Sequence, residues 1–120
     1  MNKYRLTDDK GNIEILELLS SDNNVLKFKG HDSIINLRSF DDGSLRLFRE
    51  SPQVRVSIVL LEGNITQMKI YDKSQNVYVD CSVKTRTADM TNIEDICIEY
   101  DMLNGEEIAD TISLRIGVKR

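Results

Sequence analysis

The sequence is poor in residues that interrupt strands and in residues that commonly perform chemistry. Its 120 residues include one proline (Pro52), one histidine (His31), two cysteines and no tryptophan. One histidine and no CxxC pair are too few for a typical zinc site. The Gly-x-Ser-x-Gly elbow of serine hydrolases and a phosphate-binding glycine loop are also missing. We therefore predict no metal, no cofactor and no catalytic residues, and expect that the chain is not an enzyme.

Long apolar runs are also absent. No stretch approaches the roughly 20 apolar residues that a membrane-spanning helix needs, and the first five residues lead into no apolar signal core. We expect a cytoplasmic protein without a membrane partner. The net charge of −4 argues against nucleic acid as a partner, because gripping its backbone needs a concentrated positive surface. Free thiols are favoured for Cys81 and Cys97, with a cross-strand disulfide as the alternative.

The sequence is rich instead in alternating apolar and polar residues, most clearly near its C-terminus. Two runs place apolar residues at every second position: Ile96, Ile98, Tyr100 and Met102, then Ile112, Leu114, Ile116 and Val118. Successive side chains of a strand point to opposite faces, so each run predicts a strand with one buried face. The turn residues Asn104 to Glu107 between them predict an antiparallel hairpin.

Parity constrains the register of this hairpin. Both apolar sets are even-numbered, and directly paired residues must share a face. This predicts a loop of three or five residues centred near Gly105 or Glu106, rather than a two-residue turn. Asp110 lies on the apolar parity, and we interpret it as a residue at the barrel rim, where water reaches.

Similar patterns bounded by turn residues continue through the rest of the chain. They predict strands at 4–7, 13–19, 25–29, 34–40, 44–50, 54–61, 65–71 and 77–85. Apolar residues change parity within 13–19, which indicates a bulge or a run buried on both faces, with a helix as the alternative. In 77–85 one face carries Val77, Val79, Cys81, Val83 and Thr85. The segment 86–92 is a longer connection with room for one helical turn.

About ten strands joined by short turns predict an all-β fold. We expect residues 1–120 to form a single antiparallel β-barrel of about eight to ten strands with little helix, because closing the sheet removes its exposed edges. The interior of such a barrel is either filled by side chains or holds one small ligand.

Four segments also resemble a known family. They are Leu45-Arg46-Leu47-Phe48-Arg49-Glu50, residues 54–62, residues 77–85 and residues 96–102. In the order and spacing of its strands the chain is similar to the bacterial YwiB-like family of unknown function, which has a calycin-like (lipocalin-like) β-barrel. The resemblance implies that barrel and a bacterial origin, and no established activity. The chain departs from the family at Glu50-Ser51-Pro52 and at Ser74-Gln75-Asn76, where the family usually carries glycine. The N-terminal part of the chain is also shorter than in the family.

The resemblance is carried by three residues, which we take as candidate ligand-binding residues: Arg49 closing one strand, Thr85 after the valine-rich strand and Tyr100 in the penultimate strand. Arg49 shares the parity of Leu45 and Leu47 and so points inward near a barrel end. There it either caps the barrel by bonding to backbone carbonyls or meets a ligand carboxylate.

Other charged residues have simpler interpretations. Five basic positions, Arg46, Arg49, Arg55, Lys84 and Arg86, form either an anion-binding patch or charge spread over a solvated surface. The acidic residues Glu94, Asp95, Glu99 and Asp101 are expected on a solvated face, and His31 in a surface turn.

Two functions remain open. The first is binding of a small apolar or anionic ligand in the barrel lumen, by analogy with the fold. The alternative is a non-catalytic interaction or structural module, a monomer or a homodimer. The alternative is suggested by Phe48, Val59 and Leu61, which are apolar on the predicted outer parity.

Overall fold

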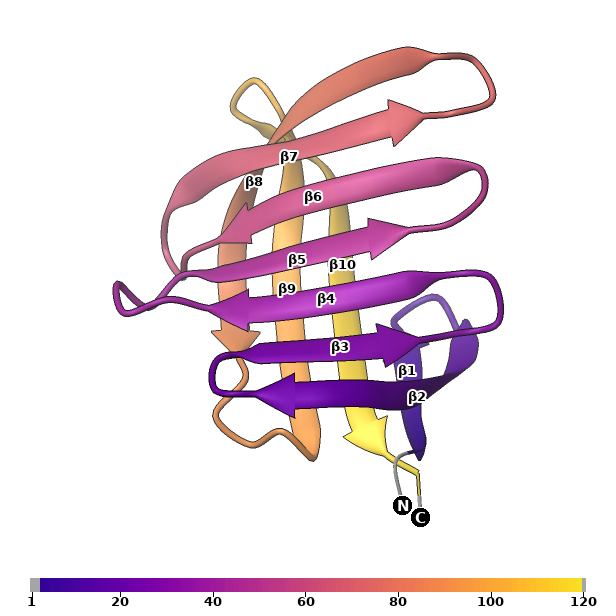
Figure 1. The fold of residues 1–120 in the computed structure, drawn as a ribbon. Coiled ribbons are helices and arrows are strands. Elements are labelled where there is room, and N and C mark those ends of the chain that lie inside the picture. Colours follow the sequence, from indigo (N-terminus) through magenta and orange to yellow (C-terminus); the bar gives the residue numbers. More distant parts are fainter. Residues whose placement is uncertain (1–2, 120) are drawn as a thin grey trace.

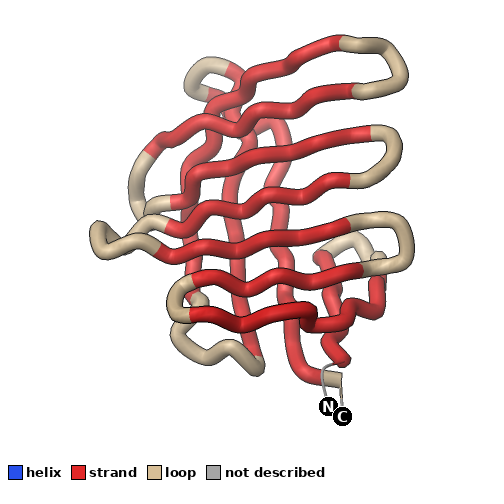
Figure 2. The backbone as a smooth tube through the Cα atoms, viewed as in Figure 1, coloured by secondary structure: helices blue, strands red, loops and turns tan. Residues whose placement is uncertain are grey.

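The computed structural model describes residues 3–119, which contain strands and turns and no helix (Figures 1 and 2). Ten strands follow one another: β1 (Lys3–Asp8), β2 (Ile13–Asp22), β3 (Val25–Lys29), β4 (Ile34–Ser39), β5 (Leu45–Glu50), β6 (Val54–Leu60), β7 (Ile65–Asp72), β8 (Val77–Asp89), β9 (Asp95–Asn104) and β10 (Glu107–Val118). The all-β prediction is confirmed. Accordingly, no helix in the described part of the chain is long and apolar enough to cross a membrane.

The strands close into one antiparallel barrel. Each strand pairs with its neighbours in the sequence, and β1 also pairs with β10, which closes the ring. Figure 1 shows β2 to β7 running across the front, with β9 and β10 crossing behind them at a steep angle. The predicted antiparallel barrel of eight to ten strands is confirmed, and closure leaves none of these strands with a free edge.

The apolar core fills the space between the front and back strands. Ile96, Ile98 and Ile116 from the C-terminal hairpin are buried there as predicted. Phe28 from β3 packs edge-on against Tyr4 from β1, with ring centroids 5.0 Å apart. The fully buried side chains come from both layers: Leu16, Leu26, Phe28, Ile35, Leu37, Ile58, Leu60, Val83, Thr85, Ile96, Ile98 and Ile116. The middle of the barrel is therefore filled by side chains.

The turn between β9 and β10 differs from the prediction. Asn104 pairs with Glu107, so the connection is a two-residue turn, in which Gly105 has a φ of +66°. A glycine with positive φ at the first central position is typical of a type II′ hairpin turn. The register then shifts between Ile108 and Asp110, where Ala109 forms a bulge. The extra residue in the bulge restores the predicted pairing of the even-numbered residues, although the predicted odd-numbered loop was wrong.

Two further bulges shape β2 and β8. In β2 the register shifts between Leu18 and Ser20, so Leu19 turns outward. This bulge lies beyond the change of parity after Ile15, where the register with β1 is continuous; Ile13 and Ile15 are exposed, so neither a bulge nor burial on both faces explains that change. The segment is a strand, which excludes the helix. In β8 the shift lies between Thr85 and Thr87. The strand continues past this bulge to Asp89, so the predicted long connection from Arg86 was wrong and contains no helical turn.

The first part of β8 is less covered than its alternation suggested. Val77 and Val79 share the parity of Val83, yet they are 43% and 48% exposed, whereas Val83 is completely buried. Residues 77–80 are exposed on both faces of the strand. The prediction of one buried face therefore holds only for the second half of β8.

Candidate functional site

Polar residues of the inner face gather at one end of the barrel, where β2 and β10 begin and β5 ends. Glu14, Arg49 and Asp110 lie within four residues of the strand ends at this side of the barrel, and each has the parity that faces inward. Tyr100 also faces inward but lies farther along β9, deeper in the barrel. We call Glu14, Arg49, Tyr100 and Asp110 the polar rim. Such groups remain near a barrel end because water still reaches them there.

Arg49 is held by a carboxylate of the chain rather than by backbone carbonyls. Its Nη2 donates to Glu14 Oε1 at 2.7 Å, and Ser33 Oγ donates to Glu14 Oε2 at 2.9 Å. Gly30 makes this approach sterically feasible, because a Cβ added there would lie 2.0 Å from Glu14 Oε2. Arg49 thus faces the barrel end as predicted, and its partner is a carboxylate of the chain itself rather than the backbone carbonyls of a cap.

Tyr100 lies almost fully buried beside this ion pair. Burial raises the pKa of its phenol to about 12, with opposing influences from the positive charge of Arg49 and the negative charge of Asp110. The phenol is therefore neutral and able to donate at physiological pH. No hydrogen bond of its hydroxyl is found within residues 3–119.

Thr85 has a structural task in this arrangement. It pairs directly with Tyr100 across β8 and β9, but its Oγ1 accepts a hydrogen bond from the Leu61 amide at 3.2 Å. Its carbonyl accepts from the Gly63 amide at 2.9 Å. Thr85 is fully buried and ties the β6–β7 connection to β8, so the structure brings Arg49 and Tyr100 together and uses Thr85 elsewhere.

Apolar side chains surround the polar rim without being fully covered. They pack against the core and are only partly buried: Val56, Ile70, Cys81, Met102, Ile112 and Leu114. The inner face at this end therefore still contacts solvent, unlike the middle of the barrel.

The outward face of β9 is less solvated than the sequence suggested. Asp101 was expected in water but is 3% exposed. It accepts hydrogen bonds from Thr111 Oγ1 at 2.8 Å and Arg86 Nε at 3.0 Å. The Thr111 bond, followed by the Arg86 contact, lowers the pKa of Asp101. The carboxylate serves to link β8, β9 and β10.

The remaining candidates do not form a second chemical centre. His31 is highly exposed and lies 3.8 Å from Asp32. Arg55 is paired with Glu50 and Arg86 with Asp101, so the five basic positions do not form one common patch. Among the described residues, no three of His, Cys, Asp and Glu come together as a metal site, and both cysteines are free.

The sequence did not single out Glu14 of the polar rim or Ser33, which donates a hydrogen bond to Glu14. Glu14 has the same parity as Leu16 and Leu18, just as Arg49 has the parity of its leucine neighbours. Two opposite charges on inward parities at strand ends were a usable signal for an ion pair at the barrel end. Ser33 lies in a turn and offers no comparable signal.

Comparisons of the chain with protein-family models, with curated proteins and with solved structures give no match. The YwiB-like resemblance and the calycin-like classification thus stay predictions.

Proposed function

We propose that this chain is a non-catalytic binding protein that takes a small anionic ligand with an apolar body at the polar rim. We place it in the cytoplasm of a bacterium, within the YwiB-like family. The ligand's acidic group would lie between Arg49 and Tyr100. The proposal is carried by one observation, which is that the Tyr100 hydroxyl lies close to the Arg49 guanidinium and has no hydrogen bond among residues 3–119, although most of the side chain is buried.

The chemistry of the rim supports an anion with an apolar tail. A guanidinium has five N–H donors, so Arg49 keeps donors after binding Glu14. A neutral phenol adds one more donor, and a carboxylate accepts from both. The partly covered side chains of Val56, Ile70 and Ile112 offer apolar contact.

The test is titration of the labelled protein with octanoate and benzoate, followed by nuclear magnetic resonance of the methyl groups. We expect shifts at Val56, Ile70 and Ile112. Tyr100→Phe should weaken binding by about 10-fold or more, since hydrogen bonds to charged groups contribute about 1.5–3 kcal/mol. Arg49→Gln should weaken it at least as much.

Arg55→Gln is the matched control, because it removes the same charge from the outside of the barrel, where Arg55 is paired with Glu50 at 3.1 Å. It should leave the affinity unchanged within about two-fold. Equal weakening by Arg55→Gln and Arg49→Gln, or shifts confined to the outer surface, would contradict binding at the rim.

The alternative is self-association through the outside of the barrel, and a different set of residues favours it than the sequence suggested. Phe48, Val59 and Leu61 are half-buried, whereas Ile65 is 62% and Tyr78 is 74% exposed. Tyr71 stacks on Tyr78 with ring centroids 4.4 Å apart. Exposed apolar and aromatic side chains at the two ends of the β7–β8 pair offer contacts to a second copy of the chain.

Light scattering over a wide concentration range tests this alternative. A homodimer should dissociate when Tyr78→Ser and Ile65→Thr are combined. A wild-type protein that stays monomeric at millimolar concentration would exclude it and leave ligand binding as the proposed function.

A further inference from the structure

Two arginines face each other on the outside of the barrel, away from the polar rim. Arg38 on β4 and Arg46 on β5 are directly paired in register, and both are exposed. Both also lie against Phe40, with guanidinium carbons 5.2 Å and 4.9 Å from the centre of its ring. Phe40 belongs to the connection between these strands, so one aromatic ring holds both cations.

Arg38 and Arg46 repel each other, and neither forms an ion pair with a carboxylate in the described part of the chain. Like charges directly opposite each other in a sheet are destabilising. The cation–π contacts with Phe40 recover part of this. Within residues 3–119 neither guanidinium has a carboxylate within 4.0 Å, whereas Arg49, Arg55, Arg86 and Arg115 each have one. The pair therefore places two positive charges side by side on a chain with a net charge of −4. Carboxylates lie farther away: Asp22 and Asp41 line the adjoining pocket, and Asp42, whose pKa is lowered mainly by hydrogen bonds from Ser44, is also influenced by the charge of Arg46.

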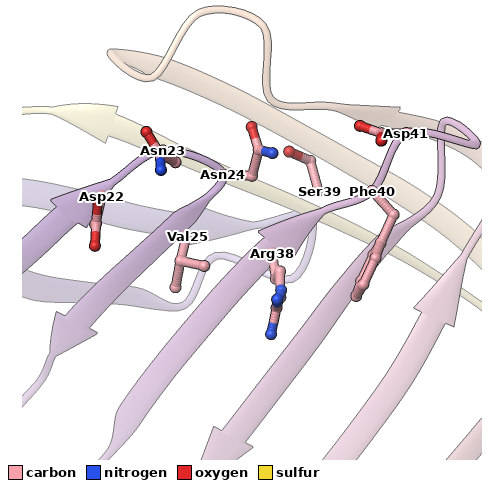
Figure 3. A pocket seen from close by; sticks show the side chains of 8 residues that line it. All are labelled: Asp22, Asn23, Asn24, Val25, Arg38, Ser39, Phe40 and Asp41. Carbon is pink, nitrogen blue, oxygen red and sulfur yellow. The ribbon is translucent and has the colours of Figure 1, made fainter.

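A surface pocket of about 350 Å³ adjoins Arg38 and Phe40, between the β2–β3 turn and the β4–β5 connection (Figure 3). Its lining comprises Asp22, Asn23, Asn24, Val25, Arg38, Ser39, Phe40 and Asp41. In Figure 3 the side chains of Val25, Arg38 and Phe40 extend to the same side of the strands, while that of Asp41 points away from them. The turn is held in place because the Ser39 amide donates to the Asn24 carbonyl at 2.9 Å.

We propose that Arg38 and Arg46 form a clamp for the phosphate group of a phosphate monoester, whose remaining part lies in this pocket. Two guanidinium groups match the charge of about −1.5 to −2 that a phosphate monoester carries at pH 7. They also match its oxygens, because each guanidinium donates a fork of N–H groups. A carboxylate would neutralise only one of the two. This site is separate from the polar rim and does not depend on the function proposed there.

The experiment is a titration of the ¹⁵N-labelled protein with inorganic phosphate and with glucose 6-phosphate in solution, and a parallel sedimentation assay with vesicles containing phosphatidic acid. We expect shifts at Val25, Phe40 and the backbone around Arg38 and Arg46. Arg38→Gln and Arg46→Gln should each weaken binding about 10-fold or more, while Arg55→Gln should change it less than about two-fold. Arg49→Gln, which acts at the rim, should leave it unchanged.

Urea unfolding separates a binding role from a structural one. If the pair serves binding, Arg46→Gln should keep or raise the unfolding midpoint, since it removes a repulsion. Dependence on Arg38 and Arg46 in the soluble arm or in the vesicle arm supports the clamp and identifies the source of the phosphate. The proposal is overturned if neither arm shows that dependence, if Arg55→Gln weakens binding equally, or if Arg46→Gln lowers the midpoint while affinity is unchanged.

Discussion

At the scale of single residues, three charged side chains depart from the rule that polar residues take the outward parity and stay exposed. Glu14 and Arg49 sit on inward parities and are held by each other, and Asp101 sits on an outward parity and is nevertheless buried. In each case hydrogen bonds from other strands or from a turn satisfy a charge that would otherwise be costly to cover. Arg86, the bulge residue of β8, supplies one of the bonds to Asp101.

Replacing Asp101 tests this at one residue. Asp101→Asn should lower the free energy of unfolding at pH 7, because Thr111 and Arg86 lose the charge that they bind. The folded-state pKa of Asp101 lies below its ordinary value of 3.8, so the contribution is present above that pH and is lost as pH falls through the lowered pKa. Urea unfolding of both proteins between pH 7 and pH 3 measures it. A difference that does not shrink toward pH 3 would show that charge is not the cause.

At the scale of strands, alternation predicts where strands lie better than how they are covered. The bulges at Leu19, Arg86 and Ala109 each insert one residue and so reset which parity faces inward. The β9–β10 hairpin combines a two-residue turn with such a bulge, and that combination produces the same final register as a longer loop. Alternation alone does not distinguish the two.

The long strand β8 offers a matched pair of valines. Val83→Thr should cost about 1–3 kcal/mol, because it places an unpaired hydroxyl in the core, where Val83 is completely buried. Val79→Thr is the same change on the same parity, yet it should alter stability by less than about 0.5 kcal/mol, since Val79 is half-exposed. Chemical unfolding of both variants provides the comparison. Equal losses would mean that Val79 is covered in solution, as a second copy of the chain would cover it.

At the scale of the whole molecule, closure depends on the pairing of the two ends of the described chain. Residues Tyr4 to Asp8 of β1 pair with Leu114 to Val118 of β10, and β1 pairs on its other side with β2. The remaining strand pairs join neighbours in the sequence. β1 is therefore the tenth strand, which converts an open nine-strand sheet with edges at β2 and β10 into a barrel.

Removing residues 1–8 should open the barrel and expose the edges of β2 and β10 to other chains. We expect the truncated protein to aggregate or to elute as large species in size-exclusion chromatography. A synthetic peptide of residues 1–9 added during refolding should restore the native elution volume. A truncated chain that is monomeric and as stable as the full chain would show that closure is dispensable.

The sequence by itself determined that the chain is all-β, where its ten strands lie and which face of the C-terminal hairpin is dry, because strand periodicity is a local property of alternating side chains. It also placed Arg49 inward at a barrel end and Asp110 at the rim. Only the tertiary structure decided that Arg49 meets Glu14, 35 residues away, that Thr85 serves a neighbouring turn and that Asp101 is buried. Those outcomes depend on bulges and on closure, which bring together strands whose contacts no local pattern records.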